Sequence, residues 1–390
     1  MIPYGKHSIN TFDVLKVAWQ MRTGALTQGS KVEEFEREIA EYVGVKYAVA
    51  VSSATAGLHI SLLALELQEG TEVITTPISF VASANAIVYS SLKPLFVDIN
   101  RETLNLDNSL VIDKLKSRTN INAIIPVHFA GLPCDMELIA ETARSHNLKV
   151  IEDAAHALGG KYSNGMRVGS CAYSDLTVFS FHPVKSITSG EGGMVTTNSE
   201  DLYRKLLRLR SHGITKLDDS FQNPILARTS QSKNPWYYEM QELGYNYRLT
   251  DFQCVLGISQ MRRIETFMAR RQALRNQYLQ AFSKHPLITP GQALQFGQSA
   301  NHIFPVRIRF SEIQKSRTEI MSKLMEQGIR TQVHYIPIPL HPFYQKRGYG
   351  VTDLPEAMSY YEEALTLPLY PSLRFREQER VIENLIKLTS

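Results

Sequence analysis

Short apolar runs alternate with amphipathic segments between about residues 30 and 200. Between residues 31 and 43, apolar residues recur at helical spacing and Gly44 follows, which predicts a helix that ends at this glycine. The runs that predict strands cover residues 47–52, 72–76, 94–99, 123–127, 149–152, 176–181 and 193–197. Most of them are continuously apolar, as is typical of strands covered on both faces. This part of the chain therefore predicts an α/β fold whose sheet is covered on both faces.

The pattern changes beyond residue 250. Residues 249–285 predict one or two long helices, and the remainder predicts a strand at 302–310, a helix at 316–327 and an amphipathic helix at 376–388. A chain of 390 residues also exceeds the roughly 250–300 residues at which a single hydrophobic core stops growing. We therefore expect a large domain over residues 1–265 and a smaller C-terminal α+β domain over residues 266–390.

The composition narrows the class of protein. The chain is 43% hydrophobic and 21% charged, which argues against a disordered or coiled-coil protein. Its 42 Lys and Arg against 38 Asp and Glu leave a net charge of +4, spread along the chain without the clustered basic face that nucleic-acid binding needs. No run approaches the roughly 18 apolar residues of a membrane span, and no signal peptide is visible. We expect a cytoplasmic protein that binds neither nucleic acid nor membranes.

The cysteines and histidines do not predict a metal site. Cys134, Cys171 and Cys254 are odd in number and far apart, so neither a disulfide framework nor a zinc site is expected, and a reducing compartment fits. His334 and His341 are separated by seven positions around two prolines, so no regular helix aligns them. Motifs for phosphate-binding loops, dinucleotide binding, serine hydrolases and zinc peptidases are absent as well.

Chemically useful residues follow four of the predicted strands, at residues 52–55, 76–80, 153–156 and 180–185. In α/β sheets, functional residues gather at the carboxyl ends of strands, where loops meet helix N-termini. These four segments are therefore the candidate functional site.

Lys185 and Asp153 are the strongest candidates for catalysis. Lys185 follows an apolar, aromatic segment and precedes the glycines of residues 190–193. Desolvation in such a setting can make a lysine amine a Schiff-base nucleophile, although a solvent-facing loop lysine has the same local sequence. Asp153 ends a predicted strand, where its carboxylate could hold a pyridinium nitrogen protonated or could cap a helix.

Other residues of these segments suit a flat, phosphorylated ligand. The small and hydroxyl residues 53–55 precede an apolar helix, whose N-terminus could bind phosphate or could simply be capped by them. Ser180 could add a hydroxyl to the same phosphate. Phe80 could stack on a planar ring or pack beneath its loop, and His156 could hydrogen-bond either the ligand or the protein.

In this order, the segments SAT (53–55), TPISF (76–80), EDAAHALG (152–159), FSFHPVK (179–185) and EGG (191–193) resemble the sugar aminotransferases of the DegT/DnrJ/EryC1/StrS family. These are fold-type I enzymes that depend on pyridoxal 5'-phosphate, so the resemblance implies that the α/β large domain has a mixed, mostly parallel sheet sandwiched by helices. The resemblance covers almost the whole chain, from residues 26–29 through 243–250 to 332–337.

The resemblance implies a role for each matching residue. Lys185 corresponds to the lysine that forms the Schiff base and moves the proton, and Asp153 to the partner of the pyridine nitrogen. The remaining cofactor-binding positions are Phe80, which stacks on the ring, Ala54, Thr55 and Ser180, which bind the phosphate, and Asn246, which reaches the phosphate from the other subunit. This last position implies a homodimer with shared active sites. His156 stands beside the cofactor where many relatives carry glutamine.

Within the family, the chain is most similar to the branch that serves pseudaminic acid biosynthesis. That branch aminates C4 of UDP-2-acetamido-2,6-dideoxy-β-L-arabino-hexos-4-ulose with glutamate as the donor, which leaves as 2-oxoglutarate, and the cofactor passes through pyridoxamine phosphate. The positions that would contact the nucleotide sugar are Tyr4, Gly24, Ala25, Leu26, Thr27, Gln332, Val333, His334 and Tyr335. The chain departs from the branch at residues 338–341 and in a longer insert near 217–238.

Three other functions stay open at this point. The substrate could be another nucleotide-linked keto sugar, aminated at C4 of the D-xylo epimer or at C3. A related sugar dehydratase has histidine in place of the lysine, so Lys185 argues against it. A non-catalytic member of the family would have no need of a Schiff-base lysine.

Overall fold

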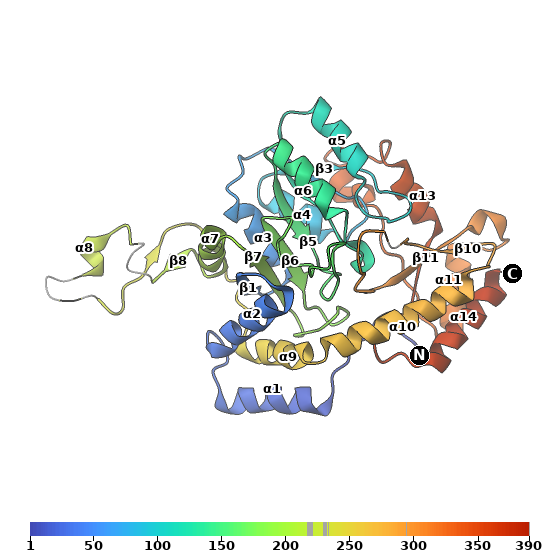
Figure 1. The fold of residues 1–390 in the computed structure, drawn as a ribbon, viewed down its shortest axis with the longest axis horizontal. Coiled ribbons are helices and arrows are strands. Elements are labelled where there is room, and N and C mark those ends of the chain that lie inside the picture. The colour runs from blue at the N-terminus through green and yellow to red at the C-terminus, as the bar shows by residue number, and fades with distance from the viewer. Residues whose placement is uncertain (217–220, 229–231, 233, 294, 390) are drawn as a thin grey trace.

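The computed structural model describes residues 1–216, 221–228, 232, 234–293 and 295–389, and a seven-stranded sheet lies at its centre (Figure 1). The strands are β1 (Tyr47–Val51), β2 (Glu72–Thr75), β3 (Lys93–Phe96), β4 (Ile121–Ile125), β5 (Lys149–Asp153), β6 (Leu176–Ser180) and β7 (Gly193–Thr197). Their order in the sheet is β1-β7-β6-β5-β4-β2-β3, and β7 runs antiparallel to both of its neighbours while the other pairs are parallel. The predicted mixed, mostly parallel sheet is confirmed.

Both faces of this sheet are covered, which explains why the strand sequences are continuously apolar. Alternate residues enter separate hydrophobic clusters: Ala50 and Ile74 belong to one, and Val49 and Val73 to the other. The first cluster packs under α2 (Ser30–Val43), α6 (Met136–Ser145) and α9 (Asp251–Met261), and the second under α3 (Ala54–Ala64), α4 (Ala82–Tyr89) and α7 (Glu200–Arg210). Burial on both faces stabilises each strand and leaves its carboxyl end as the accessible part.

The strand predicted at residues 94–99 is shorter than expected. β3 ends at Phe96, and Asp98 beyond it hydrogen-bonds a helix instead of pairing in the sheet. The carboxylate of Asp98 accepts hydrogen bonds from the backbone N–H groups of Glu356 and Ala357, at 2.8 and 2.9 Å, in the first turn of α13 (Pro355–Glu363). A helix terminus leaves such N–H groups without intrahelical partners, which is why this aspartate is useful there.

A second hydrophobic core lies beside the first. The region predicted as one or two long helices forms two, α9 and α10 (Ile264–Phe282), and α10 contributes Phe267 to the first core and Tyr278 to the second (Figure 1). The second core packs around an antiparallel sheet of β10 (Ile288–Pro290), β11 (Phe304–Ile308) and β12 (Ala364–Leu367), with α11 (Arg317–Glu326) and α14 (Phe375–Thr389) against it. Two further helices are α5 (Asn108–Ser117) and the short α12 (Pro342–Gln345).

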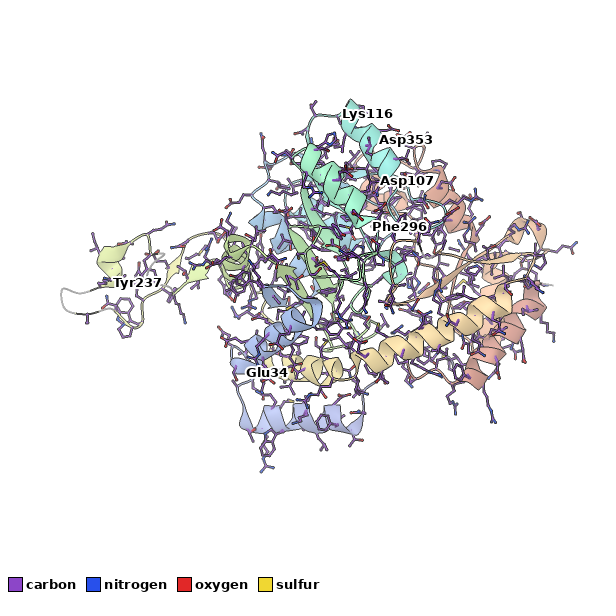
Figure 2. The ribbon with its side chains drawn as sticks, in the orientation of Figure 1. Glu34, Asp107, Lys116, Tyr237, Phe296 and Asp353 are labelled. Carbon is purple, nitrogen blue, oxygen red and sulfur yellow. The ribbon has the colours of Figure 1, made fainter. Side chains whose placement is uncertain are left out.

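Two features lie outside the main body. Helix α1 (Thr11–Thr23) packs along α9 at the edge of the molecule, and a hairpin of β8 (Ile214–Thr215) and β9 (Glu239–Met240), which carries α8 (Pro224–Ala227), projects away from the body (Figure 1). Tyr237 lies on this arm (Figure 2). The insert expected near 217–238 is part of this arm, and several of its residues fall outside the described ranges. No helix in the described part of the chain is long and apolar enough to cross a membrane.

Candidate active site

A cavity of about 690 Å³ opens at the carboxyl ends of the central strands. Its lining combines residues that follow β1, β2, β5 and β6, so the structure brings the four candidate segments together. The predicted residues that line it are Tyr4, Ala54, Thr55, Phe80, Asp153, His156, Ser180, Lys185, Gln332, Val333, His334 and Tyr335. The segment at 332–335 reaches the cavity because its backbone pairs with β12, through hydrogen bonds between Gln332 and Thr366.

Lys185 lines the cavity in an apolar setting. The loop after β6 turns back on itself, where the backbone N–H of Lys185 donates to the carbonyl of His182 at 2.9 Å. Burial lowers the pKa of the Lys185 amine from 10.5 to about 8, and the nearby carboxylate of Asp153 opposes this shift. About a tenth of the amine is therefore neutral at pH 7, and the neutral form is the one that acts as a nucleophile or takes up a proton.

Asp153 is held rigidly at the end of β5. Its Oδ1 accepts the backbone N–H of Ala155 at 3.1 Å, and its Oδ2 accepts the hydroxyl of Ser83 at 2.6 Å. The side chain is buried but still lines the cavity. The alternative role of a helix cap does not apply, because the residues after β5 form turns. Ser83 was not predicted from the sequence, since it lies on α4, 70 positions from its partner.

One end of the cavity suits an anion. Ser53 is the N-cap of α3 and accepts the N–H of Ala56 at 3.1 Å, so the half-buried Ala54 and Thr55 begin the first turn of this helix and line the cavity. A helix N-terminus offers N–H groups and the positive end of the dipole to an anion, so capping and anion binding coexist here. Gly193 makes the arrangement possible, because a Cβ atom at this position would lie 2.7 Å from the backbone N of Ala54.

Another part of the cavity lining is aromatic. The Phe80 side chain is 59% exposed and faces the cavity, so it does not pack beneath its loop. Its ring centroid lies 6.3 Å from that of Tyr335, whose hydroxyl is 3.2 Å from Nε2 of His156. Burial, together with the charge of Lys185, lowers the pKa of His156 well below its usual range, so this ring is neutral.

Two further histidines, His302 and His334, line the cavity. The ring of His302 lies 4.4 Å from that of His156, and burial lowers its pKa as well. His302 was missed from the sequence, because only the tertiary fold brings the start of β11 to this cavity. Nδ1 of His334 is 3.0 Å from the Thr366 hydroxyl, and burial with the charge of Lys185 lowers the pKa of His334 to about 3. The three rings therefore add hydrogen-bonding capacity without adding charge.

Five predicted residues do not reach the cavity of their own chain. Asn246, Gly24, Ala25, Leu26 and Thr27 are all exposed. The two segments that carry them lie side by side: Thr27 forms a β-bridge with Thr250, and the carbonyl of Leu26 accepts the N–H of Asp251 at 3.0 Å. Asn246 is expected to reach the phosphate of the other subunit, so its position in one chain does not test that prediction, and the sugar contacts of residues 24–27 stay predictions as well.

Comparison with known proteins gives consistent matches over the whole length. Residues 7–386 match the sequence model of the DegT/DnrJ/EryC1/StrS aminotransferase family. The chain is 38% identical to the spore coat polysaccharide biosynthesis protein SpsC of Bacillus subtilis, over 98% of the chain and 95% of that protein. It is 36% identical to the UDP-4-amino-4,6-dideoxy-N-acetyl-beta-L-altrosamine transaminase of Campylobacter jejuni, over 100% of the chain and 97% of that protein. A solved structure also matches, that of Helicobacter pylori PseC, an aminotransferase involved in the biosynthesis of pseudoaminic acid. The TM-score is 0.89 at 31% sequence identity, and the match covers 100% of the chain and 99% of PseC.

Proposed function

The chain belongs to the DegT/DnrJ/EryC1/StrS aminotransferase family, and from this premise we propose that it transfers the amino group of L-glutamate to C4 of UDP-2-acetamido-2,6-dideoxy-β-L-arabino-hexos-4-ulose. The product is UDP-4-amino-4,6-dideoxy-N-acetyl-β-L-altrosamine. The family and its named relatives make the protein a pyridoxal phosphate-dependent sugar aminotransferase. The choice of sugar is supported by the similarity to the Campylobacter transaminase and to the Helicobacter enzyme.

The observation that carries the chemistry is that Lys185 and Asp153 line the same cavity. The other lining residues fit pyridoxal phosphate. Thr55 at the start of α3 and Ser180 at the end of β6 suit the phosphate, and the exposed side chain of Phe80 suits the pyridine ring. Nδ1 of His156 is buried with no hydrogen-bond partner among the described residues, which supports a ligand that supplies one.

When bound, the cofactor supplies an electron-withdrawing ring that stabilises negative charge on the carbon that loses a proton. The neutral amine of Lys185 would remove the proton from Cα of glutamate. Lys185 would later deliver a proton to C4 of the sugar from the side of the cavity that it lines. A pKa near 8 suits both tasks, because the amine both takes and gives a proton readily near neutral pH. Asp153 provides a fixed negative charge toward the pyridine nitrogen, and its two hydrogen bonds hold it in place.

The nucleotide sugar would approach along Tyr4 and residues 332–335. The rings of Tyr4 and His334 are 5.4 Å apart, and both line the cavity. In the described part of the chain, this lining contains Lys185 but no arginine, so the diphosphate of the nucleotide needs positive charge or N–H donors from elsewhere.

We propose that a second copy of the chain supplies these groups to the diphosphate. The exposed positions of Asn246 and residues 24–27 support a homodimer in which these segments complete the partner's cavity. Large apolar side chains are exposed near them: Trp19 is 68% exposed, Leu26 51% and Leu243 74%. Apolar surface of this kind marks a contact region on an otherwise polar protein.

The experiment that tests the function is a single-turnover titration. The enzyme is converted to the pyridoxamine phosphate form with glutamate, freed of amino acid, and mixed with each UDP-4-keto epimer while the absorbance of the bound cofactor is followed. Recovery of the original spectrum with the β-L-arabino sugar alone is the expected result. A protein that glutamate does not convert contradicts the proposal, and Lys185→Ala is the control that should not turn over.

A second candidate is the amination of another nucleotide-linked keto sugar. The similarity to SpsC, which is named for spore coat polysaccharide, is as high as that to the altrosamine transaminase and supports this alternative. Recovery of the spectrum with the α-D-xylo epimer alone would favour it and leave the roles of Lys185 and Asp153 unchanged.

A further inference from the structure

Three buried side chains form a hydrogen-bonded chain that ends at the cavity. Oγ of Ser79 lies 2.8 Å from Oγ of Ser83, which lies 2.6 Å from Oδ2 of Asp153. Ser83 is fully buried, and the exposed fractions of Ser79 and Asp153 are both 4%. Solvent therefore does not compete for these hydrogen bonds.

The direction of the protons follows from the chemistry of the end group. An ionised carboxylate can only accept, so the hydroxyl of Ser83 donates to Asp153. Ser83 has a single proton, so the hydroxyl of Ser79 must donate to the oxygen of Ser83. Donation in one direction along the chain polarises both hydroxyls and strengthens the last bond.

We propose that Ser83, supported by Ser79, is a positioning residue that orients the Asp153 carboxylate toward the pyridine nitrogen of the cofactor. With Ala155 N–H on Oδ1 and Ser83 O–H on Oδ2, rotation of the carboxylate breaks one of two buried hydrogen bonds. Only the remaining lone pairs are then directed to a ligand in the cavity. This inference rests on the proposed function, since it gives Asp153 the role stated there.

The local structure of α4 argues against a purely structural role for this hydroxyl. Serine near a helix start usually hydrogen-bonds the backbone of that helix. The N-cap residue Val81 provides no side-chain cap, so the first turn of α4 could use such a bond. The hydroxyl of Ser83 instead makes its short bond to Asp153, and its contact with the carbonyl of Phe80 is longer, at 3.5 Å.

The test compares the affinity of the apoprotein for pyridoxal phosphate in four forms: wild type, Ser83→Ala, Asp153→Asn and the double variant. We expect Ser83→Ala to weaken cofactor binding about tenfold, the effect of losing a hydrogen bond to a charged group. In the Asp153→Asn background, Ser83→Ala should weaken cofactor binding less than about twofold, because the oriented charge is already gone.

Ser90→Ala is the matched control on the same helix. Ser90 is the C-cap residue of α4, and its hydroxyl donates to the carbonyl of Ala86, so this change should leave cofactor binding unaltered. Unchanged binding in Ser83→Ala, or equal weakening in both backgrounds, would overturn the inference. The readout is independent of the sugar: a protein that binds the cofactor but does not transaminate contradicts the proposed function while the Ser83 comparison can still be made.

Discussion

Nε2 of His128 lies 2.7 Å from Oε2 of Glu152, and neither side chain has any exposure to solvent. Nδ1 of His128 accepts the backbone N–H of Cys134 at 3.1 Å, so the ring donates from Nε2 to the carboxylate. The hydroxyls of Tyr162 and Ser174 donate to the same carboxylate. Glu152 directly precedes Asp153, so this network holds β5 from the face of the sheet opposite the cavity.

Replacing Glu152 should destabilise the protein in a pH-dependent way. Burial by itself raises the pKa of Glu152, but the hydrogen bonds from His128, Ser174 and Tyr162 outweigh it and lower the pKa. A lowered pKa means that the stabilisation is present above the unfolded pKa of about 4.3 and is lost as the pH falls through the folded value. Glu152→Gln should lose about 2–4 kcal/mol at pH 7 in chemical unfolding, with a smaller further loss in acid than wild type.

The exposed Glu141 on α6 provides the control. Glu141→Gln should unfold like wild type at every pH. If Glu152→Gln matched this control at pH 7, the buried network would contribute nothing to stability.

Recombination of the apoprotein with pyridoxal phosphate should depend on the pH through Lys185. Only the neutral amine attacks the aldehyde, and the pKa of this amine is about 8. The rate measured by stopped-flow absorbance should therefore rise about tenfold per pH unit below this value and level off above it. A rate that continued to rise to about pH 10, as for an ordinary lysine, would contradict the effect of burial.

Gly193→Ala should weaken cofactor binding and lower stability. The new Cβ would lie 2.7 Å from the backbone N of Ala54 and 2.8 Å from the carbonyl oxygen of Ser53, so the start of α3 must shift. We expect a loss of about 1–3 kcal/mol in unfolding and a weaker affinity for pyridoxal phosphate. Gly350→Ala is the control, because a Cβ at that position meets nothing within 4 Å. Equal behaviour of the two variants would show that α3 tolerates the shift.

His156→Gln should retain most of the activity. The amide can still hydrogen-bond the hydroxyl of Tyr335, which His156 contacts at 3.2 Å, and like the neutral ring it adds no charge. We expect kcat within about threefold of wild type for His156→Gln, and a loss of about tenfold or more for His156→Leu, which leaves the hydroxyl unpartnered. A His156→Leu enzyme with normal kcat would exclude a role for this hydrogen bond.

Subunit complementation should reveal a shared active site. Dimers of the Lys185→Ala variant and dimers of the Asn246→Ala variant should each have low activity. In a hybrid dimer of the two, one site would combine Lys185 of one subunit with Asn246 of the other, so activity should return to about half of the wild-type value. Differently tagged subunits allow the hybrid to be purified and assayed. A hybrid as weak as its parents would mean that Asn246 serves its own subunit or none.

The local sequence predicted much of the fold because the signals involved are short. The boundaries of α2, α11 and β7 agree with the predicted ranges within about one residue, since apolar periodicity and caps act over a single element. Neither α1 nor the projecting hairpin was predicted: the apolar side chains of α1, such as Leu15 and Trp19, are exposed in the single chain and do not mark a core-facing side. The domain limits and the roles of the site residues stay predictions.

By itself, the sequence determined the sheet class and the residues that follow the strand ends, including Lys185, Asp153 and Phe80. These depend on contiguous patterns and on the rule that strand ends carry function. Only the tertiary structure decided that Ser83 reaches Asp153, that His302 packs against His156, and that Asn246 stays outside the cavity. Such contacts join residues far apart in the chain, so they depend on the order of strands and on packing between the two cores. The lowered pKa of Lys185 has the same origin, because desolvation is a property of the assembled cavity.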